Sequence, residues 1–134
     1  MARIKVGDLE IISILYLEVP FPMAGVFPNV PSEAFEPYRP LYPDAFHESE
    51  LKLGISCYVI LGGGQAILVD MGLRPDVHPQ ERGQLVEHLK SEGLNPEDVD
   101  TVAFTHLHPD HVGWNFQGGK PTFASARYVV QDVD

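Results

Sequence analysis

THLHPDHVGWN, residues 105–115, holds three of the chain's six histidines and one aspartate, directly after the apolar run VDTVAF. Side chains two positions apart in an extended segment point the same way, so we expect His106 and His108 to face one point. The proline that follows turns the chain and can carry Asp110 and His111 towards a second point close by. Imidazole and carboxylate groups are ligands of zinc and of other first-row divalent metals. The spacing therefore predicts two adjacent metal half-sites; the alternative is a solvated polar loop in which histidines cluster.

The rest of the chain predicts strands and one long helix. Apolar runs bounded by charge, proline or glycine predict strands at residues 9–19, 55–61, 65–70 and 100–106, with one or two more in 121–131. Glycines 62–64 predict a hairpin turn, because the Lys-Ser/Thr pair that a phosphate loop needs does not follow them. We expect an amphipathic helix over about residues 79–91, ended by Gly93, and a short helix after Pro109. This order predicts an α/β domain with its site at the carboxyl edge of the strands.

Residues 20–52 contain most of the chain's twelve prolines together with six aromatic residues. Proline fixes φ and removes a backbone donor, so neither a long helix nor a central strand is expected there. The aromatic residues make the segment too apolar for a solvated linker. It is predicted to be a packed irregular arm, or a lid over a site, within one domain spanning residues 1–134.

The composition excludes several classes of protein. Hydrophobic residues make up 44% of the chain and charged residues 21%, which excludes disorder of the whole chain. The net charge of -10 argues against nucleic acid or an anionic membrane as partner and suits bound cations. Cys57 is the only cysteine, so no intramolecular disulfide can form, and its apolar surroundings predict a buried hydrophobe. The N-terminal residues lack the apolar stretch of a signal peptide or membrane helix, and we expect a cytoplasmic protein.

THLHPDHVGWN resembles the H-x-H-x-D-H signature of the metallo-β-lactamase superfamily, most closely that of its lactonase and organic-ester hydrolase branches. ILVDMG, residues 67–72, resembles an earlier strand of that family that ends in Asp-x-Gly. The resemblance covers about residues 8–134. It implies an α/β fold (α+β by some schemes), the first half of the family's αββα sandwich, with a mixed sheet and flanking helices.

The resemblance also implies a role for each residue of the motif. His106 and His108 would be ligands of a first metal, and Asp110 and His111 ligands of a second. Zinc would be the metal, one or two ions per site, although another first-row divalent metal would suit the same donors. Asp110 would also act in catalysis by orienting a bridging hydroxide that attacks the carbonyl carbon of a small-molecule lactone or ester. Bound zinc can bring the pKa of water near 7, so no separate strong base is required.

Two residues outside the motif take roles by the same resemblance. Asp70 would orient the loop that carries the motif, residues 105–115, without binding the metal, and Gly72 would let the backbone turn beside Asp70. The alternative for Asp70 is a plain aspartate that caps a turn at the end of a strand.

The chain departs from a complete family member after the motif. Such a member has three further metal ligands downstream, whereas no histidine follows His111 here and the later carboxylates are Asp132 and Asp134. We therefore expect half of each metal site and half of the fold. The apolar sheet face and unpaired edge of half a fold need a cover. A homodimer, a separately encoded second-half chain, or the aromatic-rich arm of residues 20–52 folded onto the sheet would supply it.

Three residues are candidates to complete the site. His47, within the arm, is the best compensating metal ligand, while His78 and His88 fit a loop and a solvated helix face better. Trp114 and Phe116 are candidates for the wall of a substrate pocket, although packing is the more usual role for such residues.

The sequence leaves three functions to compare; it favours the first below for ancestry and chemistry and the second for this particular polypeptide, and our prediction is the hydrolase. The first is a metal-dependent hydrolase that is complete only as an oligomer or with a second half. The second is a truncated, catalytically silent metal-binding half-domain that acts in assembly. The third is a structural interaction module whose histidines bind nothing.

Overall fold

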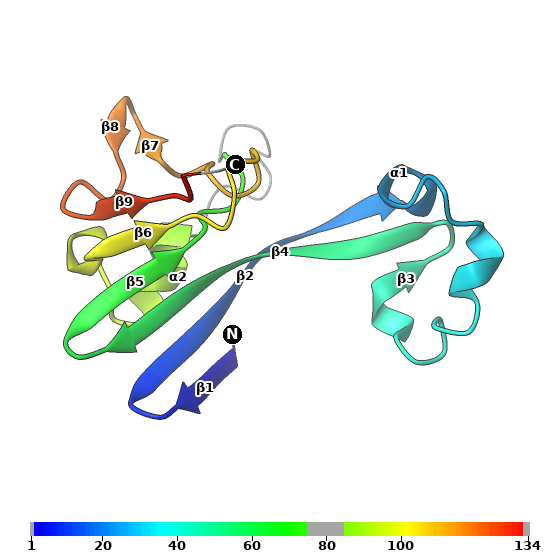
Figure 1. The fold of residues 1–134 in the computed structure, drawn as a ribbon, viewed down its shortest axis with the longest axis horizontal. Helices are drawn as coiled ribbons and strands as arrows, with labels where there is room; N and C mark the ends of the chain where they lie inside the picture. Colours follow the sequence, from blue (N-terminus) through cyan, green and yellow to red (C-terminus); the bar gives the residue numbers. More distant parts are fainter. Residues whose placement is uncertain (1, 75–84, 133–134) are drawn as a thin grey trace. The chain divides into compact units, whose positions relative to one another are not determined.

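The computed structural model describes residues 2–74 and 85–132, which belong to two compact units (Figure 1). The first unit comprises Met1–Leu17 and Ile55–Asp134, and the second comprises Glu18–Gly54. In chain order, the strands and helices are β1 (Ala2–Val6), β2 (Leu9–Pro22), α1 (Met23–Val26), 3₁₀ helices Ser32–Phe35 and Pro43–Ala45, β3 (Phe46–His47), β4 (Glu50–Gly62), β5 (Gln65–Val69), α2 (Leu85–Ser91), a 3₁₀ helix Pro96–Asp98, β6 (Thr101–Ala103), β7 (Phe116–Gln117), β8 (Lys120–Pro121) and β9 (Arg127–Val129).

One mixed sheet has the strand order β1-β2-β4-β5-β6-β9, with β3 paired to β4. The β1–β2 and β4–β5 pairs are antiparallel, while β5–β6 and β6–β9 are parallel. The β4–β5 hairpin turns at Gly63 and Gly64, whose φ angles of 59° and 76° are those that a two-residue turn of this kind requires. The glycine run is therefore a hairpin turn, and the predicted mixed α/β architecture is confirmed.

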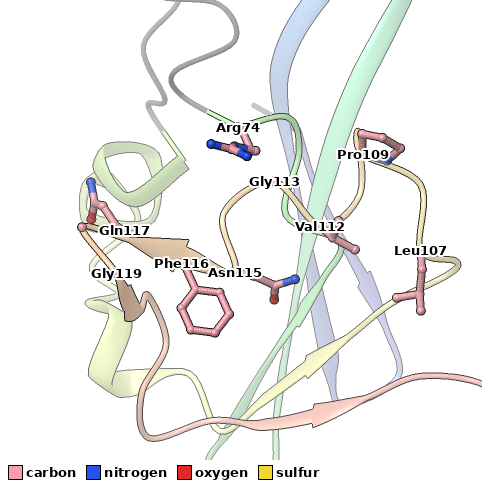
Figure 2. A pocket seen from close by; sticks show the side chains of 10 residues that line it. Arg74, Leu107, Pro109, Val112, Gly113, Asn115, Phe116, Gln117 and Gly119 are labelled. Atoms are coloured by element: carbon pink, nitrogen blue, oxygen red, sulfur yellow. The ribbon is translucent and has the colours of Figure 1, made fainter.

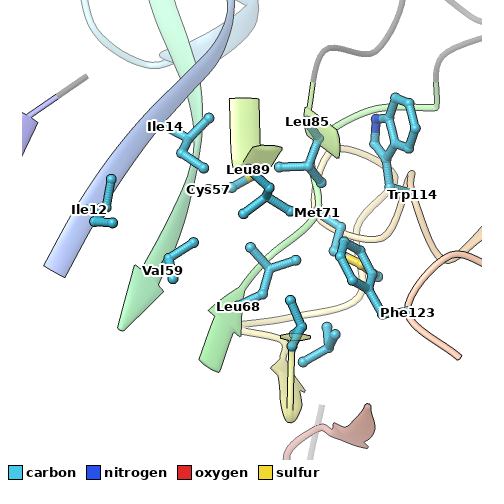
Figure 3. Packing of buried hydrophobic residues seen from close by; sticks show 12 residues of the cluster. Ile12, Ile14, Cys57, Val59, Leu68, Met71, Leu85, Leu89, Trp114 and Phe123 are labelled. Carbon is cyan, nitrogen blue, oxygen red and sulfur yellow. The ribbon is translucent and has the colours of Figure 1, made fainter. Parts of the chain in front are cut away.

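The hydrophobic core of the first unit lies between the sheet and α2 (Figure 3). Buried residues alternate along the strands, as expected for a sheet with one covered face, with Cys57 and Val59 on β4 and Leu68 on β5. Leu85 and Leu89, one turn apart on α2, belong to the same cluster. Burial raises the pKa of the Cys57 thiol to about 12, with a smaller contribution from the charge of Asp70.

Two strands are longer than the sequence predicted, and β1 was not predicted at all. β2 runs to Pro22 and β4 begins at Glu50, both beyond the expected ends. Pro20 and Pro22 are two positions apart, so their missing N–H groups lie along the same edge of β2 and the strand can continue.

The helices differ from the prediction in one respect. The part of the predicted helix that the structure describes, α2, is helical, and Gly93 follows it with a φ of 82°; residues 79–84 lie outside the described residues. The short helix expected after Pro109 is wrong, since the chain there forms turns. Its backbone groups bond across to the end of β5 instead of along a helix, as described below. No helix in the described residues is long and apolar enough to cross a membrane.

The second unit is packed around Phe35. The Phe35 ring lies 5.5 Å from that of Phe27 and 6.4 Å from that of Phe46, measured between centroids. The Arg39 guanidinium lies 5.1 Å from the centroid of the Phe46 ring and donates a hydrogen bond of 2.7 Å to the carbonyl oxygen of Glu48. These contacts give the proline-rich segment a small core of its own.

Candidate metal centre

The carboxyl ends of β5 and β6 bring the two sequence motifs together. The two strands are parallel, with Val69 opposite Ala103, so the residues that follow each strand emerge at the same edge of the sheet. The Asp70 N–H donates to the Ala103 carbonyl oxygen (3.0 Å), and the Thr105 N–H donates to Asp70 Oδ1 (2.9 Å). Residues that lie 35 positions apart in sequence thus meet at one point.

Asp70 is a buried carboxylate, only 5% exposed, that accepts two hydrogen bonds from Thr105 and lies close to His111. Besides the Thr105 N–H, Thr105 Oγ1–H donates to Asp70 Oδ2 (2.8 Å), and His111 Nδ1 lies 2.9 Å from the same oxygen. Asp70 also has a φ of 58°, a left-handed conformation that aspartate tolerates better than most residues. A buried carboxylate needs such partners, so Asp70 holds Thr105 and His111 in place.

The four predicted metal ligands gather on the loop that follows β6. The His106 ring centroid lies 4.6 Å from that of His108 and 3.9 Å from that of His111. Asp110 Oδ2 lies 3.3 Å from His111 Nε2, so the carboxylate and the imidazole nitrogen meet at one place. Three imidazoles and a carboxylate therefore occupy a small volume at the sheet edge.

The donor types suit zinc, which binds imidazole nitrogen and carboxylate oxygen. The number of converging donors is smaller than a catalytic zinc site usually has. Among residues 2–74 and 85–132, no group of three or more His, Cys, Asp or Glu side chains is arranged to hold one ion. If these four donors divide into two pairs as the sequence predicts, each pair needs at least one further ligand, which the described residues do not supply.

Backbone hydrogen bonds fix the loop against the end of β5. The Met71 N–H donates to the His111 carbonyl oxygen and the Gly113 N–H to that of Gly72, both at 2.7 Å. Gly72 has a φ of 59°, which favours glycine at this turn. A Cβ atom on Gly113 would overlap the backbone of Leu73. Gly113 is therefore required by the close approach of two backbone segments.

A pocket of about 770 Å³ lies beside this loop (Figure 2). Leu107, Pro109 and Val112 line it, and they alternate with the four predicted ligands, none of which lines it. Phe116, a candidate for a pocket wall, lines it with an exposed side chain. Trp114, the other candidate, is buried in the core cluster instead. The pocket thus lies against the loop but contains none of the predicted metal ligands.

The remaining candidates lie on other segments of the sequence than this loop. His47 lies in β3 of the second unit with an exposed side chain, and its role as a ligand stays a prediction. His88 was expected on a solvated helix face but is half-buried, and its Nδ1 has no hydrogen-bond partner among the described residues. His78 lies outside the described residues.

Thr105 was missed by the sequence reasoning. It bonds to Asp70 through both its N–H and its hydroxyl, and Oγ1 lies 3.1 Å from His106 Nδ1. The sequence did contain a sign of this role, because the Thr105 hydroxyl lies directly between an apolar strand and the first histidine. A polar group at the end of a strand commonly bonds to a neighbouring backbone or side-chain group.

A mixed sheet thus carries clustered imidazole and carboxylate donors at the carboxyl edge of its parallel strands. The sequence model of the metallo-beta-lactamase superfamily matches residues 52–132. The chain therefore belongs to this superfamily.

Similar proteins were found by sequence as well. Metallo-beta-lactamase domain-containing protein 1 of Mus musculus is 49% identical over 47 residues, which are 35% of this chain and 16% of that protein. A ribonuclease of Thermus thermophilus is 36% identical over 58 residues, which are 43% of this chain and 12% of that protein. The chain thus matches less than a quarter of the length of these relatives.

Solved structures of the same fold match nearly the whole chain. The hydrolase AbOPH is 29% identical with a TM-score of 0.75, over 94% of this chain and 42% of that one. A probable metal-dependent hydrolase from Staphylococcus aureus is 25% identical with a TM-score of 0.72, over 96% of this chain and 48% of that one. The dizinc lactonase AidC, at 21% identity and a TM-score of 0.79, shares the fold. This chain spans less than half of each of these proteins.

Proposed function

We propose that this chain carries one half of the metal centre of a zinc-dependent hydrolase that cleaves lactones, esters or related carbonyl compounds. The observation that carries the proposal is the gathering of His106, His108, Asp110 and His111 at one sheet edge, with His111 held by the buried carboxylate of Asp70. The similarity to a hydrolase and to a probable metal-dependent hydrolase supports it.

The residues of the loop would divide into two pairs. His106 and His108 would hold one ion, and Asp110 and His111 the other, because the Asp110 carboxylate already lies beside His111 Nε2. Bound zinc would supply activated water near neutral pH and polarise the carbonyl oxygen of the substrate. Asp70 would keep His111 Nδ1 occupied, so that Nε2 remains available as a ligand. The hydrogen bonds from Met71 and Gly113 would keep both pairs in register with the strand ends.

A second candidate is a catalytically silent metal-binding half-domain that acts as an assembly module. The described residues favour it in one respect, since they contain no group of three donors arranged around a single ion. In that case the chain would bind zinc and would hydrolyse nothing by itself.

Elemental analysis of protein purified without chelator or nickel tests the proposal. We expect about one or two zinc equivalents per chain, lost in the His106→Ala/His108→Ala variant. His88→Ala is the matched control, because this histidine lies on α2 outside the loop, and it should retain the metal. His47→Ala would lose metal only if the arm supplies a ligand.

Turnover separates the two candidates once metal is bound. Hydrolysis of a panel of lactones and aryl esters by the zinc-loaded chain, abolished in the double variant, supports the hydrolase. Zinc binding without turnover favours the silent half-domain. No uptake from micromolar zinc would overturn both.

A further inference from the structure

The hydroxyl of Thr105 connects the two pairs of donors. Oγ1 lies 2.8 Å from Asp70 Oδ2, 3.1 Å from His106 Nδ1 and 3.4 Å from His111 Nδ1. His106 belongs to the first pair and His111 to the second. A single side chain outside both pairs therefore contacts one histidine of each.

One placement of the protons best satisfies the donors and acceptors around this hydroxyl. An ionised carboxylate has no proton to give, so Thr105 must donate its single hydroxyl proton to Asp70 Oδ2. The lone pairs of Oγ1 are then left to accept, and the nearest group is His106 Nδ1, which must carry a proton. His111 Nδ1 lies 2.9 Å from Asp70 Oδ2 and 3.4 Å from Thr105 Oγ1, whereas His111 Nε2 lies 3.3 Å from Asp110 Oδ2. Of the two ring nitrogens, Nδ1 therefore has the nearer carboxylate oxygen to which a proton can be donated.

These proton positions determine which nitrogen of each ring can bind a metal. A neutral imidazole carries one proton, so protonation of Nδ1 leaves the lone pair on Nε2. Free imidazole side chains exchange between both forms, and a fixed hydrogen bond to the ring nitrogen opposite the metal selects one of them. Thr105 selects the form of His106, while Asp70, which Thr105 holds through its N–H and its hydroxyl, selects that of His111.

We propose that Thr105 is a positioning residue that fixes His106 and His111 in the Nδ1-protonated form and so presents Nε2 of both rings to the metal. The proposal rests on the proposed function, because it assigns these nitrogens as ligands. A merely structural threonine would contribute to stability through Asp70 and would leave the proton positions of the rings unchanged.

The first test uses the metal-free wild-type chain. Nitrogen-15 NMR of the histidine rings at about pH 8, where imidazole is mostly neutral, reports which nitrogen carries the proton. We expect Nδ1–H on His106 and on His111, and a mixture of both forms on the exposed His47. Nε2–H on His106 in this protein would overturn the proposal without any variant. This measurement also stands if the chain takes up no zinc, in which case the proposed function fails and the role of Thr105 in fixing the rings is still decided.

The second test compares two substitutions at position 105 with one elsewhere. Thr105→Val keeps the shape and the N–H bond to Asp70 but removes the hydroxyl, while Thr105→Ser keeps the hydroxyl. Thr122→Val is the matched control, because the Thr122 hydroxyl is buried without a partner among the described residues.

Zinc affinity, measured by competition with a chromophoric chelator, should fall about tenfold or more in Thr105→Val. It should stay within about threefold of wild type in Thr105→Ser and Thr122→Val, and the ring of His106 should lose its Nδ1–H preference only in Thr105→Val. Equal affinities in the two valine variants, or an equal loss in Thr105→Ser and Thr105→Val, would refute the role of the hydroxyl.

Discussion

Replacing Gly113 by alanine would separate the metal loop from the strand that supports it. The added methyl group would lie well under 3.0 Å from backbone atoms of Gly72, Leu73 and Arg74. Backbone cannot rotate out of the way as the end of a side chain can, and ordinary contact begins near 3.4 Å. The two segments would therefore have to move apart by on the order of 1 Å.

The cost follows from the contacts that this movement breaks. Separation would lengthen the two 2.7 Å hydrogen bonds that join Met71 to His111 and Gly113 to Gly72 past useful range. Each is worth about 1 kcal/mol, and the remaining strain of overpacking adds about 1–3 kcal/mol. We expect Gly113→Ala to lower the free energy of unfolding by roughly 3–5 kcal/mol, a large share of the 5–15 kcal/mol typical of a domain.

Urea denaturation followed by tryptophan fluorescence measures this change directly. Trp114 is the only tryptophan, is 2% exposed and adjoins the substituted residue. Gly62→Ala is the matched control in the same unit. Its methyl group would overlap only the flexible end of the Leu9 side chain and would lie in ordinary contact with the Asp8 carbonyl oxygen, so the substitution should cost about 1 kcal/mol or less. A Gly113→Ala protein within about 0.5 kcal/mol of wild type would refute the close-approach reasoning.

Three further outcomes are expected. Asp70→Asn, which keeps the left-handed backbone but cannot accept from all three donors, should lower the free energy of unfolding by about 2–3 kcal/mol in urea denaturation, and an unchanged midpoint would contradict the hydrogen-bond account. Cys57 should resist a thiol reagent at pH 8 until the chain unfolds. Burial, and then the charge of Asp70, raises the pKa of the Cys57 thiol from 9.0 to about 12, so the folded state retains the thiol proton. The contribution of Cys57 to the free energy of unfolding should therefore be complete below pH 9 and decline between pH 9 and 12. A Cys57→Ala variant with the same alkaline decline would contradict this. The chain should sediment as a homodimer of 14.9 kDa subunits. The reason is that β1 is an outer strand of the sheet and exposes Ile4 and Val6, so its unpaired edge is open to pairing with a second copy. A mass equal to one chain at micromolar concentration would count against the dimer.

Local sequence features account for much of the fold. The alternating apolar residues of β5, the Gly63–Gly64 turn and the end of α2 at Gly93 each depend on neighbours in sequence, and they lie where their patterns predict. The strand predicted over residues 100–106 is shorter, since β6 ends at Ala103. Predictions that depended on distant partners were less accurate. Residues after Pro109 were expected to form a helix, but their backbone groups bond to Met71 and Gly72, at least forty positions earlier in the chain.

The sequence by itself determined which chemical groups this protein offers. The spacing of His106, His108, Asp110 and His111 places imidazoles and a carboxylate on one short loop, whatever surrounds it. Only the tertiary structure decided how those groups are held. The parallel register of Val69 and Ala103 brings Asp70 to Thr105, and no local periodicity encodes that pairing. The proton positions of the rings depend in turn on that contact, because a hydrogen bond forms only between groups that folding has already brought within about 3 Å.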